Sequence, residues 1–526
     1  MSEPREIELK LKCEPSDLAT LQAHPLLQEA SEQRETDLTS IYFDTAEQRL
    51  REAGLELRIR QSGERFIQTL KAEGDGLFNR PEWEQEVSGP EPDLAALVDT
   101  PLRKVLRRKD QLQPLFTTIV RRRTYLVEQG SSRIEVALDS GQITAPSAGD
   151  RATTVCEVEL ELKEGSSDDV FVLADAVAAL VPLHLGVRSK AERGYSLVSG
   201  DLDRVRKAEP VPLRVDMSAA EAFQSIAHAC LRHMRLNEDI LLKGRDVEAL
   251  HQVRVAIRRL RSAFSLFGDL VEDGPGTRIK AELKRLTQPL GQARNLDVFL
   301  ATTLPVERQR HPDEAGLLNL ETQLEDHRTK AYEAVERLLR SPEWRTLLLD
   351  LVAWINSGPW LRADDRDGAG SPKQPAREFS ARELDRRRRQ VKKRGRHLDE
   401  LGPEDRHKVR IAAKKLRYGV EFFARLYPNQ KAMKRHAAFT KVISRLQDHL
   451  GALNDIATGH EVVRQVASEH AGASALFAAG MTVADLEART HELLTAAAEA
   501  HKELVDTKPF WRFIAAAARA LSSGQD

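Results

Sequence analysis

The sequence predicts an α+β protein of more than one domain, in which a barrel of antiparallel strands precedes an all-helical region. Three observations lead to this fold class. Charged and apolar residues alternate with a period of two through much of residues 1–200, which is typical of strands with one polar face. From about residue 216 the sequence becomes rich in Ala, Leu, Arg and Glu, which favour helices. The chain of 526 residues is also too long for one ordinary domain.

Composition is that of a soluble globular protein, with 41% hydrophobic and 31% charged residues. No stretch approaches the roughly 20 apolar residues of a membrane span. No apolar segment typical of a secretory signal follows Met1. Cys13, Cys156 and Cys230 lack the spacing of a metal site. We therefore expect a cytoplasmic protein without a membrane partner.

The net charge of -1 hides an uneven distribution. Residues 1–200 contain 25 Lys and Arg against 35 Asp and Glu, a net charge of -10, while the remaining residues carry +9. Opposite charges in the two parts suggest different ligands, with cations on the first part and anions on the second.

Residues 1–200 are expected to form a closed barrel, because closure leaves no exposed strand edges. Helical patterns interrupt the strands at about 15–24, 93–108 and 168–182. The common polar face is so highly charged that we expect it to line a water-filled tunnel. The strands with period-two alternation are 6–12, 55–60, 66–71, 82–87, 117–127, 133–139 and 155–163.

Residues 216–520 are expected to be helical, starting at a capping box with Ser218 as N-cap and Glu221 at N3. Segments 201–215 and 364–375 have the composition of linkers. These boundaries divide the chain into a barrel domain at 1–200, a linker at 201–215 and a helical domain at 216–520.

An internal repeat runs through the helical region. Residues 251–261 align with 407–417, and residues 286–291 align with 446–451. Self-similarity of this kind predicts two related helical bundles, at about 216–362 and 377–520.

The polar strand faces combine acids with bases. In the first strand, Glu6 and Glu8 precede Lys10 and Lys12 on one face. Clustered acids need a cation, and carboxylate oxygens suit Mg²⁺ or Mn²⁺, whereas the bases suit phosphate oxygens. The alternative is a solvated outer face with cross-strand ion pairs, but the pattern recurs on at least five strands.

The order of these motifs resembles the CYTH superfamily, the triphosphate tunnel metalloenzymes, over roughly residues 3–200. The resemblance implies an eight-stranded antiparallel tunnel that hydrolyses or rearranges triphosphates with Mg²⁺ or Mn²⁺. The matching segments are Glu6-Ile-Glu8-Leu-Lys10, Leu57-Arg58-Ile-Arg60, Thr69-Leu-Lys71, Arg80-x-Glu82-x-Glu84, Glu135-x-Ala-x-Asp139-x-Gly141, the strand with Glu157, Glu159 and Glu161, and Ser189-Lys190-x-x-Arg193-Gly-Tyr195.

The resemblance also implies roles for single residues. Water would attack a terminal phosphorus in line, with metal ions activating the water and neutralising the triphosphate, and a carboxylate of the first strand could act as base. The implied metal ligands are Glu6, Glu8, Asp139, Glu157, Glu159 and Glu161. The implied catalytic residues are Glu6, Glu8, Lys10, Arg58, Arg60 and Lys71. The implied substrate-binding residues are Lys10, Lys12, Arg58, Arg60, Lys71, Arg80, Arg121, Arg123, Lys163, Lys190 and Arg193.

Each copy of the helical repeat carries one His and three basic residues at offsets 0, 3, 7 and 10, which trace one helix face. An exposed arginine-rich face paired with acids is the alternative, and it suits residues 386–389 better. The array resembles the CHAD domain over about residues 216–520. That resemblance implies two pseudo-symmetric four-helix bundles whose shared basic channel binds inorganic polyphosphate. The implied polyphosphate ligands are His251, Arg254, Arg258, Arg261, Arg294, His407, Arg410, Lys414 and Arg417.

Together these patterns predict an inorganic triphosphatase that converts tripolyphosphate into pyrophosphate and phosphate, fused to a helical domain that binds polyphosphate and could associate with polyphosphate granules. Alternatives within the enzyme class are a nucleoside or thiamine triphosphatase and an adenylate cyclase. An alternative from another class is a non-catalytic polyphosphate-binding or granule-targeting module. Nucleic acid is disfavoured by a pI of about 7.0 and 5% aromatic residues.

Overall fold

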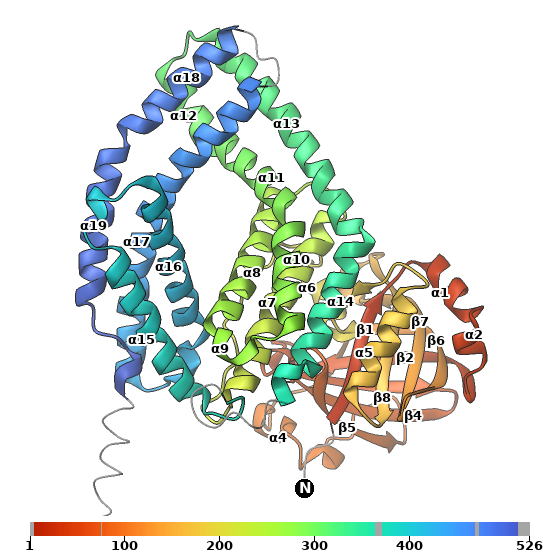
Figure 1. The fold of residues 1–526 in the computed structure, drawn as a ribbon. Coiled ribbons are helices and arrows are strands. Elements are labelled where there is room, and N and C mark those ends of the chain that lie inside the picture. Colours follow the sequence, from red (N-terminus) through yellow and green to blue (C-terminus); the bar gives the residue numbers. More distant parts are fainter. Residues whose placement is uncertain (1–4, 75, 363–370, 469–472, 514–526) are drawn as a thin grey trace, which may run out of the picture. The chain divides into compact units, whose positions relative to one another are not determined.

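The computed structural model of the protein describes residues 5–74, 76–362, 371–468 and 473–513. Its internal contacts divide the chain into two units, which are described separately (Figure 1). Unit 1 comprises residues 1–205 and 341–357, and unit 2 comprises residues 206–340 and 358–526. The predicted linker at 364–375 falls largely outside the described residues.

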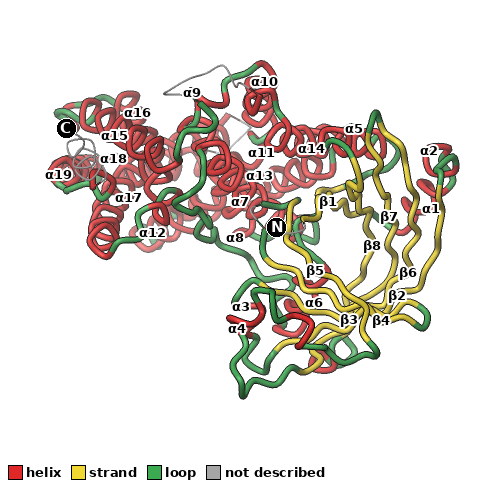
Figure 2. The backbone as a smooth tube through the Cα atoms, turned by 90° about the horizontal axis from the view of Figure 1, so that it is seen from below, coloured by secondary structure: helices red, strands yellow, loops and turns green. Residues whose placement is uncertain are grey.

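Unit 1 is built on a closed barrel of eight antiparallel strands, as the sequence predicts. The strands follow the order β5-β4-β3-β2-β6-β7-β8-β1, and β1 pairs with β5 to close the sheet. Figure 2 shows the strands curving round together, and the two-residue β9 (His184–Leu185) adds to β1. The eight strands are β1 (Arg5–Lys12), β2 (Glu32–Asp44), β3 (Leu55–Ser62), β4 (Arg65–Ala72), β5 (Asn79–Val87), β6 (Gln113–Gln129), β7 (Ser132–Thr144) and β8 (Ala152–Glu164).

Two sequence-based assignments in this unit differ from the structure. Strand β2 has no counterpart among the predicted strands, because its first half is polar on both faces and exposed. The helix expected at 93–108 is reduced to η1 (Ala95–Leu97) and α4 (Leu102–Val105). Pro101 lies between them, and a proline has no backbone N–H to continue a helix.

Short helices cover the outer, apolar face of β3 and β4. Leu57 and Ile59 of β3 belong to a buried cluster that also contains Leu50 and Leu102 from the short helices. The helices of this unit are α1 (Pro15–Gln22), α2 (Pro25–Gln28), α3 (Arg49–Glu52), α4, α5 (Ser167–Ala178), α6 (Lys190–Ser199) and α14 (Pro342–Ser357), the last of which packs against α5.

Helix α6 lies against the inner side of β6, β7 and β8. A capping box between Ser189 and Glu192 starts the helix. Tyr195 packs edge-on to Phe116 with ring centroids 5.2 Å apart. Gly194 faces the same ring, and a Cβ atom there would lie 2.1 Å from Phe116, so this close approach requires glycine.

The regular secondary structure described in unit 2 is helical, apart from an isolated β-bridge between Ser218 and Pro375. The capping box at Ser218 is confirmed, since Ser218 and Glu221 each accept a hydrogen bond from the other's backbone N–H. The long helices are α7 (Ala219–Leu241), α8 (Val247–Leu266), α10 (Gly274–Leu286), α11 (Gln288–Val298), α13 (Ala315–Arg340), α15 (Ala376–Arg394), α16 (Pro403–Phe422), α17 (Gln430–Ser468), α18 (Ala473–Ala488) and α19 (Thr490–Asp506). Shorter elements are α9 (Gly268–Val271), the π-helical η3 (Phe299–Thr303) and α12 (Leu304–Arg310).

The two copies of the sequence repeat occupy corresponding helices. Helix α8 carries the first basic array and pairs with α7, while α16 carries the second array and pairs with α15. Helices α8 and α16 also pack against each other, so the two arrays meet inside one unit.

Candidate active site

The interior of the barrel is lined by the charged strand faces. Ion pairs there join strands that are not neighbours, such as Glu6 of β1 with Lys71 of β4 and Arg122 of β6 with Glu159 of β8. Side chains from alternate strands of a closed barrel meet on its concave side. These residues therefore point into the barrel.

Asp139 of β7 and Glu157 and Glu159 of β8 form a buried acidic cluster, in which one oxygen of each lies within 4.8 Å of the others. Lys190 Nζ of α6 is 2.7 Å from Asp139 and 2.9 Å from Glu159, and it also contacts Glu157. Arg122 forks onto Asp139 with distances of 2.8 and 2.6 Å, and it also contacts Glu159. The cluster is thus a tightly packed group of alternating charges.

Strand register and a helix cap bring this cluster together. Asp139 lies directly opposite Glu157 in the β7–β8 ladder, and Lys10 lies opposite Glu159 in the β1–β8 ladder. Lys10 Nζ is 3.4 Å from Glu159. The capping box at the start of α6 fixes Lys190 as the first helical residue, facing the acids.

The surrounding cations keep the buried acids ionised. Burial by itself raises the pKa of Asp139, but the charges of Lys190 and Arg122 outweigh it and lower this pKa. Burial is likewise outweighed at Glu159, where Lys10, Lys190 and Arg122 hold the pKa well below its usual value. Both carboxylates are therefore charged at neutral pH, and their oxygens can serve as metal ligands.

Glu6 belongs to a second ionic group formed with β4 and β5. Lys71 contacts Glu6 and lies 3.2 Å from Glu82. Burial raises the pKa of Glu6, but Lys71 and Lys10 outweigh it and lower the pKa to about 2. Glu82 itself has a raised pKa, chiefly because of burial. This group provides charged oxygens on the opposite flank of β1 from β8.

The structure gathers three of the six expected metal ligands into one cluster. Glu6 lies with Lys71, Glu8 contacts Lys10, and Glu161 lies 2.7 Å from Lys163. Asp139, Glu157 and Glu159 alone approach closely enough to share one ion among the described residues of the barrel.

The structure does not bring Arg121 and Arg123 into the interior. Arg121 is 62% exposed and lies near Glu35 and Asp37, and Arg123 contacts Glu35 at 2.7 Å. Arg122, which sequence reasoning missed, is the inward residue. Three consecutive arginines follow Ile119 and Val120, so the sequence pattern could not decide which face of β6 points inward.

The other expected phosphate ligands pair mainly with carboxylates. Arg80 lies 3.0 Å from Glu56, Arg58 lies 3.9 Å from both Glu82 and Glu84, and Arg193 contacts Glu157. Lys12 is opposite Glu157 in the ladder. A phosphate group could bind these bases only by displacing the carboxylates that they now contact.

Arg60 differs from these bases. Among the described residues, no carboxylate lies within ion-pair distance of its guanidinium, and its Nε is buried without a hydrogen-bond partner. Burial, followed by the charges of Arg58 and Arg122, lowers its pKa to about 10. A half-buried cation among other cations favours an anion as its missing partner.

The donor set is compatible with a hard divalent ion. Asp139, Glu157 and Glu159 offer six carboxylate oxygens in one buried place, which is the chemistry that Mg²⁺ and Mn²⁺ prefer. Lys190 and Arg122 now neutralise these acids, so an ion would have to share them with the two cations.

Unit 2 contains a basic cluster where α8, α11 and α16 meet. It consists of Arg254, Arg258, Arg294, Arg410 and Lys414, whose charges act on one another. Arg254 donates to the backbone oxygen of Leu290 at 2.7 Å. In the described part of the chain, no carboxylate lies within ion-pair distance of any of the five.

The packing of like charges perturbs the basic cluster. Burial, followed by Arg410 and Arg258, lowers the pKa of Lys414 to about 7. Burial, followed by Arg258 and Arg294, lowers the pKa of Arg254 to about 10. His251 lies beside the cluster, where burial, followed by Arg294, lowers its pKa.

Three further expected polyphosphate ligands lie outside the basic cluster. Arg261 is exposed, and Arg417 is held by Glu421 at 2.7 Å. His407 is exposed and lies 3.3 Å from Asn454. The two ends of the four-position array therefore lie outside the cluster, because offsets 0 and 10 are about 15 Å apart along a helix axis.

Fold and sites thus define a charged antiparallel tunnel joined to a helical unit with a basic cluster. Residues 4–195 match the CYTH domain and residues 225–464 match the CHAD domain, so the chain joins a CYTH domain to a CHAD domain.

One curated relative is an inorganic triphosphatase from Haemophilus influenzae, which is 32% identical over 198 residues. The match covers 37% of this chain and 55% of that protein, so the chain spans about half the length of this relative. Among solved structures, the CHAD domain of the plant Ricinus communis is 31% identical with a TM-score of 0.49, covering 56% of this chain and 96% of that one. PptA from Streptomyces chartreusis is 16% identical with a TM-score of 0.40, covering 54% of this chain and 100% of that one.

Each helix in the described ranges is either too short or too polar to cross a bilayer.

Proposed function

We propose that the barrel hydrolyses inorganic triphosphate with a divalent metal ion and that the helical unit binds inorganic polyphosphate. The observation that carries the first part is Arg60, a cation in the charged interior without a carboxylate partner among the described residues. A triphosphate would supply the missing negative charge. The inorganic triphosphatase activity of the Haemophilus influenzae relative supports the same substrate class.

The bases of the interior would hold the substrate. Arg60 and Arg58 would bind phosphate oxygens from β3, Arg122 from β6 and Lys71 from β4. Arginine can engage two oxygens of one phosphoryl group, whereas lysine acts as a point charge. Such contacts hold the phosphate chain in place and offset the charge that develops on its oxygens.

The acidic cluster of Asp139, Glu157 and Glu159 would hold Mg²⁺ or Mn²⁺, and Glu6 and Glu8 remain candidates for a further metal contact. A bound divalent ion would polarise phosphoryl oxygens and lower the pKa of a coordinated water. Hydrolysis breaks one phosphoanhydride bond, forms a P–O bond to the water oxygen and yields pyrophosphate and phosphate. Lys190 and Arg122 would limit repulsion between the acids and the substrate.

A phosphate-release assay tests this proposal. Tripolyphosphate, ATP, thiamine triphosphate and long polyphosphate would each be offered with Mg²⁺ and with Mn²⁺. We expect turnover to be fastest with tripolyphosphate and to disappear with EDTA. A preference for ATP or thiamine triphosphate would favour the alternative enzyme classes, and absence of turnover with every substrate would favour a binding module.

The variant Arg60→Ala tests in the same assay whether Arg60 binds the substrate. Hydrogen bonds to charged groups are worth about 1.5–3 kcal/mol, so we expect kcat/KM to fall roughly 10- to 100-fold. Arg65→Ala is the matched control, since Arg65 lies on the neighbouring strand, is 67% exposed and pairs with Glu86. Equal activity in the two variants would remove Arg60 from the substrate site.

The unpaired basic cluster carries the second part of the proposal. A flexible phosphate chain would neutralise cations drawn from α8, α11 and α16. Binding of long polyphosphate and of duplex DNA would be compared at matched salt, because both affinities depend on ionic strength. We expect tighter binding of polyphosphate, and a preference for DNA would overturn the assignment.

A further inference from the structure

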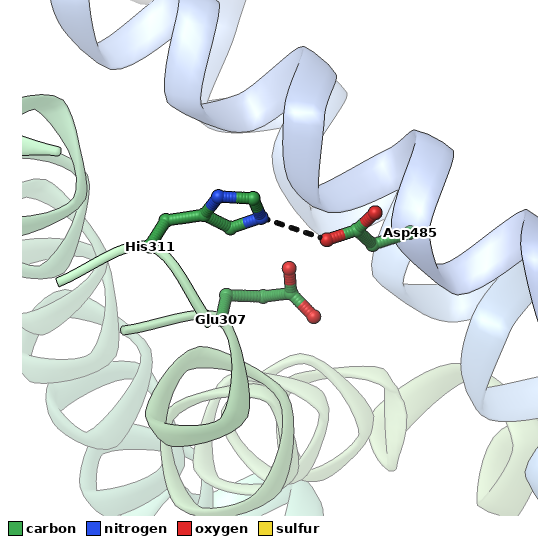
Figure 3. Close-up of side chains that lie close together, drawn as sticks. All are labelled: Glu307, His311 and Asp485. Carbon is green, nitrogen blue, oxygen red and sulfur yellow. Dashed lines mark hydrogen bonds and ion pairs between the residues drawn. The ribbon is translucent and has the colours of Figure 1, made fainter. Parts of the chain in front are cut away.

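Three potential metal ligands meet in unit 2, away from the basic cluster. Glu307 lies on α12, His311 follows the end of this helix, and Asp485 lies on α18. Figure 3 shows the three side chains converging. His311 Nε2 is 3.0 Å from Asp485 Oδ2, and one ligand atom of each residue lies within 4.8 Å of the other two.

Glu307 is the most informative member of this group. Its side chain is 2% exposed, and its Oε2 has no hydrogen-bond partner within the described residues. In Figure 3 its carboxylate points into the space between His311 and Asp485. A buried carboxylate oxygen without a donor is costly, because burial removes the hydration that would otherwise stabilise it.

Two carboxyl groups and one arginine border this space. Two carboxylates face each other, and Arg310 lies outside them, 3.5 Å from Glu307 and 3.7 Å from Asp485. A divalent cation between the acids would offset their repulsion and occupy the unpartnered oxygen.

The three residues lie on or next to packed helices. The backbone N–H of His311 donates to the backbone oxygen of Glu307 at 2.9 Å, which holds the two residues one turn apart at the end of α12. A buried apolar cluster that includes Leu304, Leu317 and Ala478 joins the α12 region to α18. The π-helical segment η3 directly precedes α12, and such segments are frequent at functional sites.

We propose that Glu307, His311 and Asp485 bind a divalent transition-metal ion, for which Zn²⁺ is the best fit. One imidazole nitrogen and two carboxylate oxygens form a mixed donor set that suits Zn²⁺ better than Mg²⁺ or Ca²⁺. His311 is 35% exposed and Asp485 is 32% exposed, so an ion can enter and water can complete its coordination. The ion would tie α12 to α18, which are far apart in sequence.

Equilibrium dialysis of the full chain against Zn²⁺, followed by elemental analysis, tests the site. We expect His311→Ala and Asp485→Asn each to bind one equivalent less than the unaltered protein. The matched controls are His491→Ala and Asp326→Asn, whose side chains are exposed on α19 and α13. Comparison with these controls removes any contribution from the barrel, because every variant retains the acidic cluster. Equal stoichiometry in the site variants and the controls would overturn the proposal.

Two further measurements do not depend on activity. With Co²⁺ in place of Zn²⁺, we expect a visible absorption band that His311→Ala abolishes and His491→Ala keeps. We also expect Zn²⁺ to raise the Tm of the unaltered protein and to have less effect on Asp485→Asn, because a ligand that binds only the folded state stabilises it. Circular dichroism before each titration establishes that the variants are folded. An unchanged cobalt spectrum in a folded His311→Ala variant would exclude the imidazole as a ligand.

Discussion

At the scale of single residues, the two units treat buried charge differently. In the barrel most inward bases already contact a carboxylate, as Lys190 does with Asp139. In the basic cluster of unit 2 the cations contact no carboxylate among the described residues. The first arrangement can remain folded without a ligand, whereas the second favours an anion, because half-buried like charges repel each other.

The lowered pKa of Lys414 makes stability and anion binding in unit 2 depend on pH. Its pKa of about 7 in the folded protein lies below the ordinary 10.5, so between these values the folded state binds fewer protons than the unfolded state. Stability from this group therefore rises with pH across that window. A bound polyanion would raise the pKa of Lys414, and binding would then take up a proton above pH 7.

We expect the affinity for long polyphosphate to weaken as pH rises above about 7, by at most about tenfold per pH unit from this one group. Titration calorimetry in buffers of different ionisation enthalpy would measure both affinity and proton uptake. Lys414→Arg should keep binding but lose this part of the pH dependence, since arginine stays protonated. Lys408→Arg, at an exposed position on the same helix, is the control. Identical pH profiles for the two variants would contradict the role of Lys414.

At the scale of secondary-structure elements, α6 links packing to the charged interior. Its first residue, Lys190, faces the acidic cluster, while Tyr195 packs on Phe116. The helix must therefore approach the strands closely, and Gly194 permits this approach. A displaced α6 would withdraw Lys190 and Arg193 from the acids.

Gly194→Ala tests this coupling. The added methyl group would overlap the Phe116 ring, and overpacking of this kind costs about 1–3 kcal/mol. We expect a lower Tm together with reduced triphosphatase activity. Gly89→Ala is the control, because a Cβ there meets nothing within 4 Å. Unchanged Tm in Gly194→Ala would show that α6 can shift without cost.

The sequence predicted elements well wherever one face is apolar and the other polar. Period two found β1 and β8, and the residues of the capping box placed the start of α7. The period-two pattern did not reveal β2, which begins with polar residues on both faces. It also did not identify Arg122 as the inward residue, because three consecutive arginines give no alternation along β6. The triad of Glu307, His311 and Asp485 was also missed, because 174 residues separate His311 from Asp485 and only the tertiary fold unites them.

At the scale of the whole molecule, the chain carries two anion-binding candidates of different construction. The barrel combines bases with acids that can hold a metal ion, which suits chemistry on a short phosphate chain. Among the described residues of unit 2, the cations of the basic cluster contact no carboxylate and have no group of three acids beside them. This arrangement suits binding of a phosphate chain without its cleavage. The two sites should therefore respond separately to substitution.

A crossed pair of variants tests this separation in the full chain. Arg258→Ser with Arg410→Ser removes two cations of the basic cluster, and it should leave kcat/KM for tripolyphosphate unchanged. The same double variant should lose most of the rise in Tm that long polyphosphate causes, and the salt dependence of binding should become shallower because fewer counterions are released. Arg60→Ala should behave in the opposite way, with weak hydrolysis and a normal response to polyphosphate. Folding should survive the double substitution, because it relieves repulsion between cations that contact no carboxylate. If the double variant instead lowers tripolyphosphate turnover as strongly as Arg60→Ala does, the two sites are coupled and the helical unit takes part in catalysis.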